Sequence, residues 1–406
     1  MMILTGQVSL VPWLRTTCWH SRIGLLLLIS LAAGQCGCQP LSLNPNPLVQ
    51  ASVKDEVNNQ DQSLPTQPQP ASADASNRRK VTSAKTSAKT EPLIVQFDFA
   101  ADFSEGLAAV RIKERYAYID QTGNPVIKVD PSLDGVSAFA EQRAVVRVAD
   151  FYGYMDRAGR IVVDPQFAAA NLYSQGLAVV RTGRGYGYID RTGTLAIEPE
   201  FTLASDFAEG MAAVKLNDQY GYINLMGDWV IQPQFEDAWS FTESLAVIKQ
   251  GEQWGYIDQA GNVAISPQFD GAFAFSESLA RIRQGNQWGF IDRQGKTVIP
   301  PRYDFASDFS EGLAAVLMGN QWGYIDKTGQ LAVPPQFDFA ADFSEGLAAV
   351  TVNNQVGFID PTGKLQIAPQ FDKVGSFSEG WAWVQTGDQW RYINASGQFL
   401  MLGEVR

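Results

Sequence analysis

The chain has 406 residues, with 31 basic and 43 acidic side chains and a formal net charge of −12. Residues 92–406 hold 23 of the basic and 38 of the acidic residues, a balance of −15 (23 − 38) that argues against a nucleic-acid partner, because phosphates need a basic surface. The only histidine is His20, and the only cysteines are Cys18, Cys36 and Cys38. The sequence beyond residue 38 therefore lacks the residues for a disulfide, a Ser-His-Asp triad, a cysteine nucleophile or a zinc site built on imidazole or thiolate.

Residues 1–38 have the layout of an export signal. Arg15 and Arg22 precede an apolar run of 12 residues, 23–34, and no acidic residue occurs before it. A membrane-spanning helix needs about 20 apolar residues, so the run predicts a cleaved signal peptide rather than a stable anchor.

The end of this segment, Gln35-Cys36-Gly37-Cys38, resembles the signal of bacterial lipoproteins, in which a small residue precedes a lipidated cysteine. Cys38 follows Gly37 and fits this pattern better than Cys36, which follows Gln35; Gln35 and Cys36 themselves depart from the residues that the family prefers there. The resemblance implies lipidation of Cys38 or of Cys36, and hence a membrane contact made only by an N-terminal lipid anchor. The alternatives are an ordinary signal peptide with two incidental cysteines and an uncleaved signal anchor.

Residues 39–91 have the composition of a linker. They are rich in Pro, Gln, Ser, Asn, Ala and Thr and contain almost no aromatic residues. Such a segment cannot bury enough apolar surface to fold, so we expect a disordered spacer that lifts the rest of the chain off a surface.

Residues 92–402 consist of one unit repeated nine times, followed by a short tail, 403–406. Two independent markers show the repeat, an Asp or Asn and a Phe or Tyr; in both series the first step is 36 residues and the other seven are 34. A fixed period of this size is the signature of a repeat architecture. The first series is Asp120, Asp156, Asp190, Asn224, Asp258, Asp292, Asp326, Asp360 and Asn394, and the second is Phe103, Phe139, Tyr173, Phe207, Phe241, Phe275, Phe309, Phe343 and Phe377.

Each unit contains three runs with the composition of strands, as in residues 313–317, 322–326 and 331–333. The segment 318–321 predicts a hairpin connection, and Asp326-Lys327-Thr328-Gly329 predicts a turn that Asp opens and that has Gly where φ is positive. Pro334-Pro335 should end the third strand. Because no window shows a convincing helical periodicity, we predict an all-β fold.

The number of strands and units decides between two architectures. Three strands are fewer than the four of a usual propeller blade, and nine units exceed the ~4–8 blades of typical propellers. We therefore expect tandem 34-residue β-hairpin repeats in an open solenoid-like stack, with a closed propeller-like ring as the alternative. The second unit, which is out of step, and the last, with Trp390-Arg391 in place of Trp-Gly, should then cap the open ends.

The unit resembles the bacterial WG repeat, which is related to the KWG repeat. The motif recurs as Trp254-Gly255-Tyr256-Ile257-Asp258 and at residues 288–292 and 322–326, each time with a Gly three residues later, and the flank Phe-Ser-Glu-Gly-Leu-Ala-Ala-Val occurs at 309–316 and 343–350. Other copies have Tyr in place of Trp, and Val356 replaces it once. The resemblance implies a β-rich module, common in bacterial surface and secreted proteins, without general catalytic activity, and it names no ligand.

Two columns of aromatic residues follow from the repeat, since strand alternation puts the first and third residues of Trp-Gly-Tyr on one side of the strand. For the second column, which starts at Tyr118, we expect a place in the core. We expect the first column to lie in the core as well. The alternative is that its rings are exposed as flat platforms for sugar rings. Its members are Tyr116, Tyr152, Tyr186, Tyr220, Trp254, Trp288, Trp322 and Trp390.

Acidic residues also recur in pairs: Asp102 and Glu105, Asp206 and Glu209, Asp308 and Glu311, Asp342 and Glu345. Paired carboxylates suit calcium or acid–base catalysis, but a catalytic pair should be singular, and these pairs repeat with drift such as Gln175 and Ser240. We interpret them as turn residues, with Asp capping backbone N–H groups. We therefore expect no catalytic residue, metal or cofactor.

The sequence as a whole indicates an exported, membrane-tethered binding protein of the cell envelope that is not an enzyme. Many equal, weak sites suit a polymer, since linked sites raise the effective concentration of one another. Cell-wall glycan or exopolysaccharide is one expected partner and a protein is the other. The alternative is a structural cell-surface protein without a specific ligand.

Overall fold

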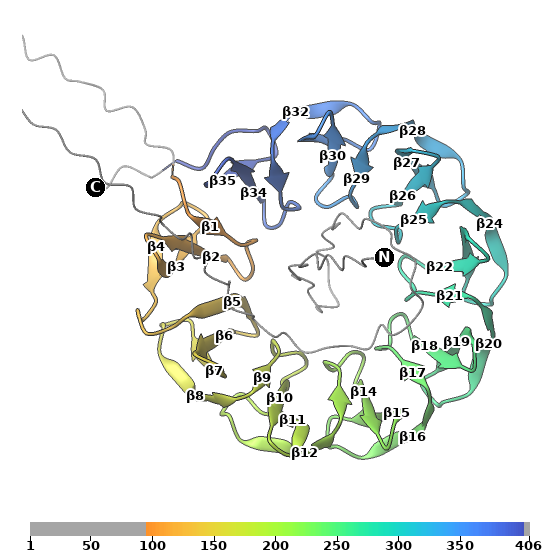
Figure 1. The fold of residues 1–406 in the computed structure, drawn as a ribbon, viewed down its shortest axis with the longest axis horizontal. Helices are drawn as coiled ribbons and strands as arrows, with labels where there is room; N and C mark the ends of the chain where they lie inside the picture. The colour runs from red at the N-terminus through yellow and green to blue at the C-terminus, as the bar shows by residue number, and fades with distance from the viewer. Residues whose placement is uncertain (1–94, 402–406) are drawn as a thin grey trace, which may run out of the picture. The chain divides into compact units, whose positions relative to one another are not determined.

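The computed structural model describes residues 95–401, which form a closed ring of nine blades, a nine-bladed β-propeller (Figure 1). Eight blades are antiparallel sheets of four strands and the ninth is a sheet of three, and the described residues contain no helix, hence none that could cross a membrane. The expected signal peptide with Cys36 and Cys38, the linker 39–91 and the tail 403–406 lie outside the described residues.

The strands of each blade follow one another from the inner edge of the ring to the outer edge. The inner strands are β1 (Phe99–Ala100), β5 (Gly135–Ala140), β9 (Ala169–Ala170), β13 (Leu203–Ala204), β17 (Asp237–Ala238), β21 (Gly271–Ala272), β25 (Phe305–Ala306), β29 (Phe339–Ala340) and β33 (Lys373–Val374). The second strands are β2 (Leu107–Ile112), β6 (Arg143–Val148), β10 (Ala178–Thr182), β14 (Met211–Leu216), β18 (Leu245–Gln250), β22 (Leu279–Gln284), β26 (Leu313–Met318), β30 (Ala348–Val352) and β34 (Trp381–Thr386). The third strands are β3 (Arg115–Asp120), β7 (Phe151–Asp156), β11 (Gly185–Ile189), β15 (Gln219–Asn224), β19 (Gln253–Asp258), β23 (Gln287–Asp292), β27 (Gln321–Asp326), β31 (Gln355–Ile359) and β35 (Gln389–Asn394). The outer strands are β4 (Pro125–Lys128), β8 (Ile161–Phe167), β12 (Leu195–Phe201), β16 (Trp229–Phe235), β20 (Val263–Phe269), β24 (Thr297–Tyr303), β28 (Leu331–Phe337) and β32 (Leu365–Phe371).

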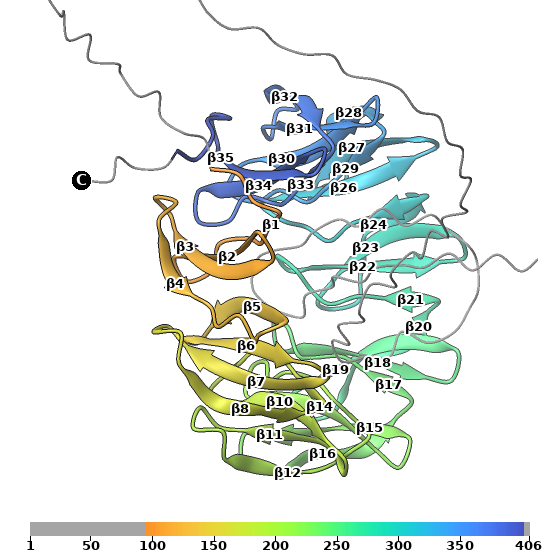
Figure 2. The same ribbon diagram turned by 60° about the vertical axis from the view of Figure 1, so that its left-hand side comes forward.

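The open stack predicted from the sequence is wrong, and the closed ring that was its alternative is what the structure shows. The ends of the described chain meet beside β35 (Figures 1 and 2). The backbone N–H of Phe97 donates to the Trp390 carbonyl at 2.9 Å, and the N–H of Trp390 donates back to Phe97 at 3.0 Å. From the other end of the chain, Leu400 donates to the Tyr392 carbonyl at 2.8 Å. The ninth blade thus completes its outer edge from both ends of the described chain, so the irregular last unit closes the ring rather than capping an open end, and the irregular second unit forms an internal blade.

Each full blade has four strands, not the expected three. The missed strand is the inner one, which has only two residues in all but the second blade and is therefore too short to show as a run in the sequence. The expected end at Pro334-Pro335 is also wrong, because β28 continues through both prolines to Phe337. It lies at the edge of its sheet, where proline is tolerated, and its register against β27 shifts at a bulge.

The bulge of the outer strand explains the glycine of the Trp-Gly motif. A Cβ on Gly323 would lie 2.6 Å from the Val333 carbonyl oxygen and 2.8 Å from the Pro335 nitrogen, and the equivalent glycine has a comparable backbone contact in seven blades. The two exceptions are Ala117, whose partner β4 pairs there without a bulge, and Arg391 in the ninth blade. The glycine therefore makes room for a neighbouring backbone.

The core lies between adjacent blades rather than within one. Tyr256 of β19 packs with Phe275 and Ile282 of the following blade, whereas Ile257 packs with Phe241 and with residues of the preceding blade. The alternation predicted for this strand is therefore confirmed, as is the buried place of the Tyr118 column, whose members are at most 1% exposed. One such cluster joins Tyr392 and Leu400 of the last blade to Phe97 and Phe103 at the beginning of the ring, so the interface that closes the ring has the same kind of apolar core.

We predict that Gly323→Ala destabilises the protein by about 1–3 kcal/mol, because the new methyl group has to displace the backbone of β28. Gly183→Ala is the matched control, since a Cβ at Gly183 would meet nothing within 4 Å and its φ is not positive. Thermal unfolding of both variants checks this. Equal melting temperatures for the two would show that the close approach of the outer strand is not the reason for the glycine.

Candidate functional site

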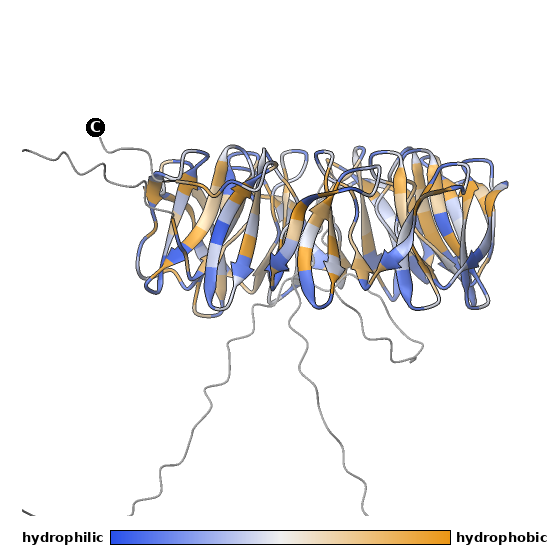
Figure 3. Cartoon of the chain, turned by 90° about the horizontal axis from the view of Figure 1, so that it is seen from above, coloured by the Kyte–Doolittle hydropathy of each residue, from blue (hydrophilic) through white to orange (hydrophobic). Residues whose placement is uncertain are grey.

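Loops emerge on two opposite faces of the ring (Figure 3). We call one the turn face: it carries the Glu-Gly turns between the inner and second strands, such as Glu311-Gly312, and the Asp-x-x-Gly turns between the third and outer strands. The other, the hairpin face, carries the hairpins between the second and third strands, such as Gly319-Asn320, and the connections between blades.

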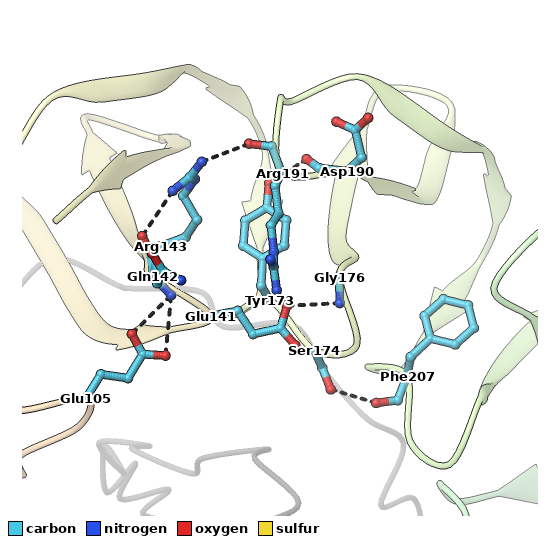
Figure 4. Close-up of polar contacts among 10 residues, drawn as sticks. All are labelled: Glu105, Glu141, Gln142, Arg143, Tyr173, Ser174, Gly176, Asp190, Arg191 and Phe207. Atoms are coloured by element: carbon cyan, nitrogen blue, oxygen red, sulfur yellow. Dashed lines mark hydrogen bonds and ion pairs between the residues drawn. The ribbon is translucent and has the colours of Figure 1, made fainter.

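The glutamates of the turn face hold the blades together in a closed circle. In every blade the Glu side chain, or Gln175 in the third, accepts a hydrogen bond of 2.8–3.1 Å from a backbone N–H in the Glu-Gly turn of the next blade, and Glu379 closes the circle on Gly106. Figure 4 shows two of these bonds, from Gln142 to Glu105 and from Gly176 to Glu141. The glutamates are therefore structural, and Gln175 shows that their charge is not needed.

The backbone at these glutamates is left-handed, with φ between 49° and 54° in all nine blades. The following residue also has positive φ, so each turn is a two-residue hairpin of the type that favours glycine at its second position. A non-glycine residue in this conformation costs about 1 kcal/mol, which the hydrogen bond to the next blade offsets.

The Asp-x-x-Gly turns match the prediction from the sequence. Asp326 Oδ1 accepts hydrogen bonds from the backbone N–H groups of Thr328 at 2.9 Å and Gln330 at 3.0 Å. The hydrogen bond from the Thr328 side chain, together with these, lowers the pKa of Asp326. Asn224 accepts the equivalent two bonds without a charge. These residues therefore cap turns.

The acidic residues of the inner edge are also occupied by neighbouring blades. Asp308 pairs with Arg281 of the preceding blade at 2.9 Å, and Asp206 accepts a hydrogen bond from the Asn171 side chain at 2.9 Å. Burial raises the pKa of Asp206 to about 7. Within residues 95–401 no three His, Cys, Asp or Glu side chains form a group that would hold a metal ion.

The hairpin face carries the aromatic column that the sequence singled out, and the structure divides it in two. Tyr152, Tyr186 and Tyr220 are buried, with exposed fractions of 4–5%, so they form part of the inter-blade core. The remaining members are half-buried: Tyr116, Trp254, Trp288, Trp322 and Trp390.

Three of the half-buried tryptophans, Trp254, Trp288 and Trp322, belong to a continuous row of rings, which we call the aromatic ladder. Neighbouring ring centroids are 5.2–5.9 Å apart across four blades. In order, the ladder runs Trp254, Trp239, Phe273, Trp288, Phe305, Trp322 and Phe339. The sequence did not reveal its continuity, because Trp239, Phe273 and Phe305 lie on inner segments at two different positions of the repeat.

A comparison with protein families identifies the repeat that forms the blades. The sequence profile described as WG containing repeat matches residues 95–116, 152–184, 186–220, 220–254, 254–288, 288–322, 322–355 and 357–390, which is more than half of the chain. The chain belongs to the WG containing repeat family. The longest stretch between matched repeats is residues 117–151, which include the irregular outer strand β4. The structure nevertheless forms a blade there.

Solved structures are similar to this WG-repeat chain in fold alone. A eukaryotic initiation factor is 11% identical with a TM-score of 0.50, covering 74% of this chain and 91% of that chain. PorZ, a bacterial surface component of the type-IX secretion system of Porphyromonas gingivalis, has a TM-score of 0.31 at 12% identity, covering 76% of this chain and 52% of that one. The extracellular domain of a two-component system of B. thetaiotaomicron has a TM-score of 0.30 at 12% identity, with the same coverage. No curated protein sequence matches the chain.

We predict that Glu311→Gln leaves the melting temperature almost unchanged, because the amide oxygen can accept the bond from Gly346 as Gln175 does from Gly210. Glu311→Ala should lower the stability by about 1 kcal/mol, since it leaves that N–H without its partner. Thermal unfolding of the two variants is the measurement. A large loss of stability in the Gln variant would contradict the structural role given to this position.

We also predict that Asp206→Asn stabilises the protein above pH 7 but not near pH 4. The folded state keeps Asp206 protonated up to about pH 7, whereas the unfolded chain releases this proton near its ordinary value of 3.8, so wild-type stability falls as the pH rises between these values. Asparagine removes this cost and can still accept the bond from Asn171. The gain at pH 8 should be about 1–2 kcal/mol, below the full value of the shift because part of the side chain stays exposed. Melting curves at pH 4 and pH 8 test it, and an equal effect at both would refute it.

Proposed function

We propose that this WG-repeat propeller is a non-enzymatic binding module of the cell envelope that grips a glycan with its hairpin face. In this proposal residues 1–38 direct export, a lipid on Cys38 or Cys36 tethers the chain to a membrane, and residues 39–91 act as the spacer. The observation that carries the binding role is the aromatic ladder.

The ladder supports binding because its seven rings are neither fully buried nor scattered. Aromatic side chains combine a large apolar face with little conformational entropy, which is why they are enriched where proteins bind partners. Sugar rings present flat apolar faces of their own that stack on such platforms. A row of similar platforms suits a polymer, because each weak contact raises the effective concentration for the next.

The roles of the repeated polar residues support a function without catalysis. The glutamates, the turn aspartates and Asp308 each have a structural partner. A catalytic pair would instead have to face a substrate and differ from its counterparts in the other blades.

The test is calorimetric titration of the purified protein with soluble cell-wall glycan fragments and with exopolysaccharide. Trp322→Ala removes a ring from the middle of the ladder and should weaken glycan binding at least tenfold, about 1.4 kcal/mol. Trp229→Ala is the control, because Trp229 is also half-buried but lies on the outer strand β16, against Phe201.

A gain of affinity is expected from Val356→Trp. Val356 is half-buried and occupies the Trp position of the eighth blade, directly after Phe339, where the ladder ends. The additional ring should raise the affinity several-fold. If wild type and Trp322→Ala bind equally well, the ladder is not the binding face. If no glycan binds, a protein partner or a purely structural role takes the place of the glycan.

A further inference from the structure

Six consecutive blades carry a basic residue at one position of the hairpin face, which we call the cation arc. The position is on the second strand, directly paired with the residue at the Trp position of the Trp-Gly motif, as Lys249 is with Trp254. The remaining three blades have Leu317, Thr351 and Gln385 there. The arc consists of Arg111, Arg147, Arg181, Lys215, Lys249 and Arg283.

The arc lies beside aromatic rings that hold its side chains in place. Three of the cationic groups lie over the ring of their cross-strand partner, Arg181 at 5.6 Å from the Tyr186 centroid, Lys215 at 5.5 Å from Tyr220 and Lys249 at 5.9 Å from Trp254. A cation at such a distance is attracted by the ring. Arg181 is exposed and the two lysines are half-buried, so the charges remain within reach of a partner.

The middle of the arc lacks an acidic residue that is present in the other blades. In seven blades an Asp or Glu of the inter-blade connection accepts a hydrogen bond from the backbone of the neighbouring hairpin. At the two blades that carry Arg181 and Lys215 this residue is Ala168 or Thr202 instead. Burial raises the pKa of Asp237, whose carboxyl group also interacts electrostatically with Lys215 and Lys249.

A hollow of about 290 Å³ lies at this point of the arc. Its walls include Arg181, Arg184, Tyr186, Glu200 and Thr202. Arg184 pairs with Glu198 at 3.4 Å, and both side chains are largely exposed. The arc therefore has a concave, polar segment beside Arg181, lined by both basic and acidic side chains.

Basic residues of the turn face are in a different situation. Arg157, Arg191 and Lys327 pair with Glu105, Glu141 and Glu277 at 3.8, 2.6 and 3.1 Å. Within residues 95–401, no ion pair of this kind is formed by Arg181, Lys215 or Lys249. The charges of Arg181, Lys215 and Lys249 are thus not neutralised by an ion pair within the described residues, although the chain has a charge of −15 over residues 92–406.

We infer that the ligand is a carboxylated polysaccharide, a polymer of uronic acid type, whose carboxylates lie along the cation arc and whose sugar rings stack on the aromatic ladder. This inference rests on the proposed glycan-binding function and names the class of glycan. The arc and the ladder overlap in the fifth and sixth blades, where Lys249 pairs with Trp254 and Arg283 with Trp288. One cation per blade suits a polymer with spaced charges better than a nucleic acid, which has about one charge per 1.7 Å.

The experiment compares polygalacturonate with the same polymer after methyl esterification, which keeps the sugars and removes the charges. The test protein carries Arg181→Gln, Lys215→Gln and Lys249→Gln, and the control carries Arg157→Gln, Arg191→Gln and Lys327→Gln. We expect the arc variant to lose at least tenfold in affinity for polygalacturonate and most of its salt dependence, while the control binds like wild type. Binding of the esterified polymer should be weaker than that of the acid polymer and equal in all three proteins.

Three outcomes would overturn the inference, and they separate it from the proposed function. If the esterified polymer binds as tightly as the acid polymer, the glycan-binding function stands and the acidic class is wrong. If an inorganic polyphosphate or a DNA oligonucleotide binds tighter than polygalacturonate at equal salt, the arc serves another polyanion. If neither form of the polysaccharide binds, the proposed function fails together with the inference.

Discussion

The packing of each blade on its neighbour is the interaction on which the rest of the structure depends. A tyrosine or phenylalanine of one blade packs against an aromatic ring of the next at 4.8–5.0 Å, and seven of the nine also donate a hydroxyl to a backbone carbonyl there. Because every blade has one apolar side facing forward and one facing backward, a linear row would leave two such sides in water. Closure buries both, and Tyr392 against Phe103 completes the circle.

Much of the local structure could be predicted from the sequence, because it depends on residues that lie close together in the chain. The period, the second and third strands, the Asp-x-x-Gly turns and the buried Tyr118 column all follow from patterns within one unit. The closure of the nine blades into a ring could not be predicted from such patterns. It depends on the small rotation from one blade to the next, summed over nine units, and a consensus sequence does not contain that angle.

The site was predictable only in part for a related reason. The tryptophans were found as a column, but burial separates Tyr152 and Tyr186 from Trp288 and Trp322, although all occupy the same position of the repeat. The difference arises from neighbours such as Phe305, which lies on an inner strand too short to be recognised. The glutamate circle was missed because a glutamate in a turn looks like a solvated residue until the next blade is in place.

The junction between the first and the last blade, which we call the seam, has a consequence for the order of folding. The ninth blade needs residue 97 from the beginning of the propeller and residue 400 from its end, and the cluster at the seam contains both of these residues. A chain emerging from the ribosome can pair the strands of each blade as they appear, but it cannot join the first blade to the last until residues 390–400 have been made. The loop to be closed then spans almost the whole propeller, and contacts of such separation form late and slowly. Until that moment the first blade exposes an apolar side, so the last residues of the repeat determine when the earliest ones become protected from solvent.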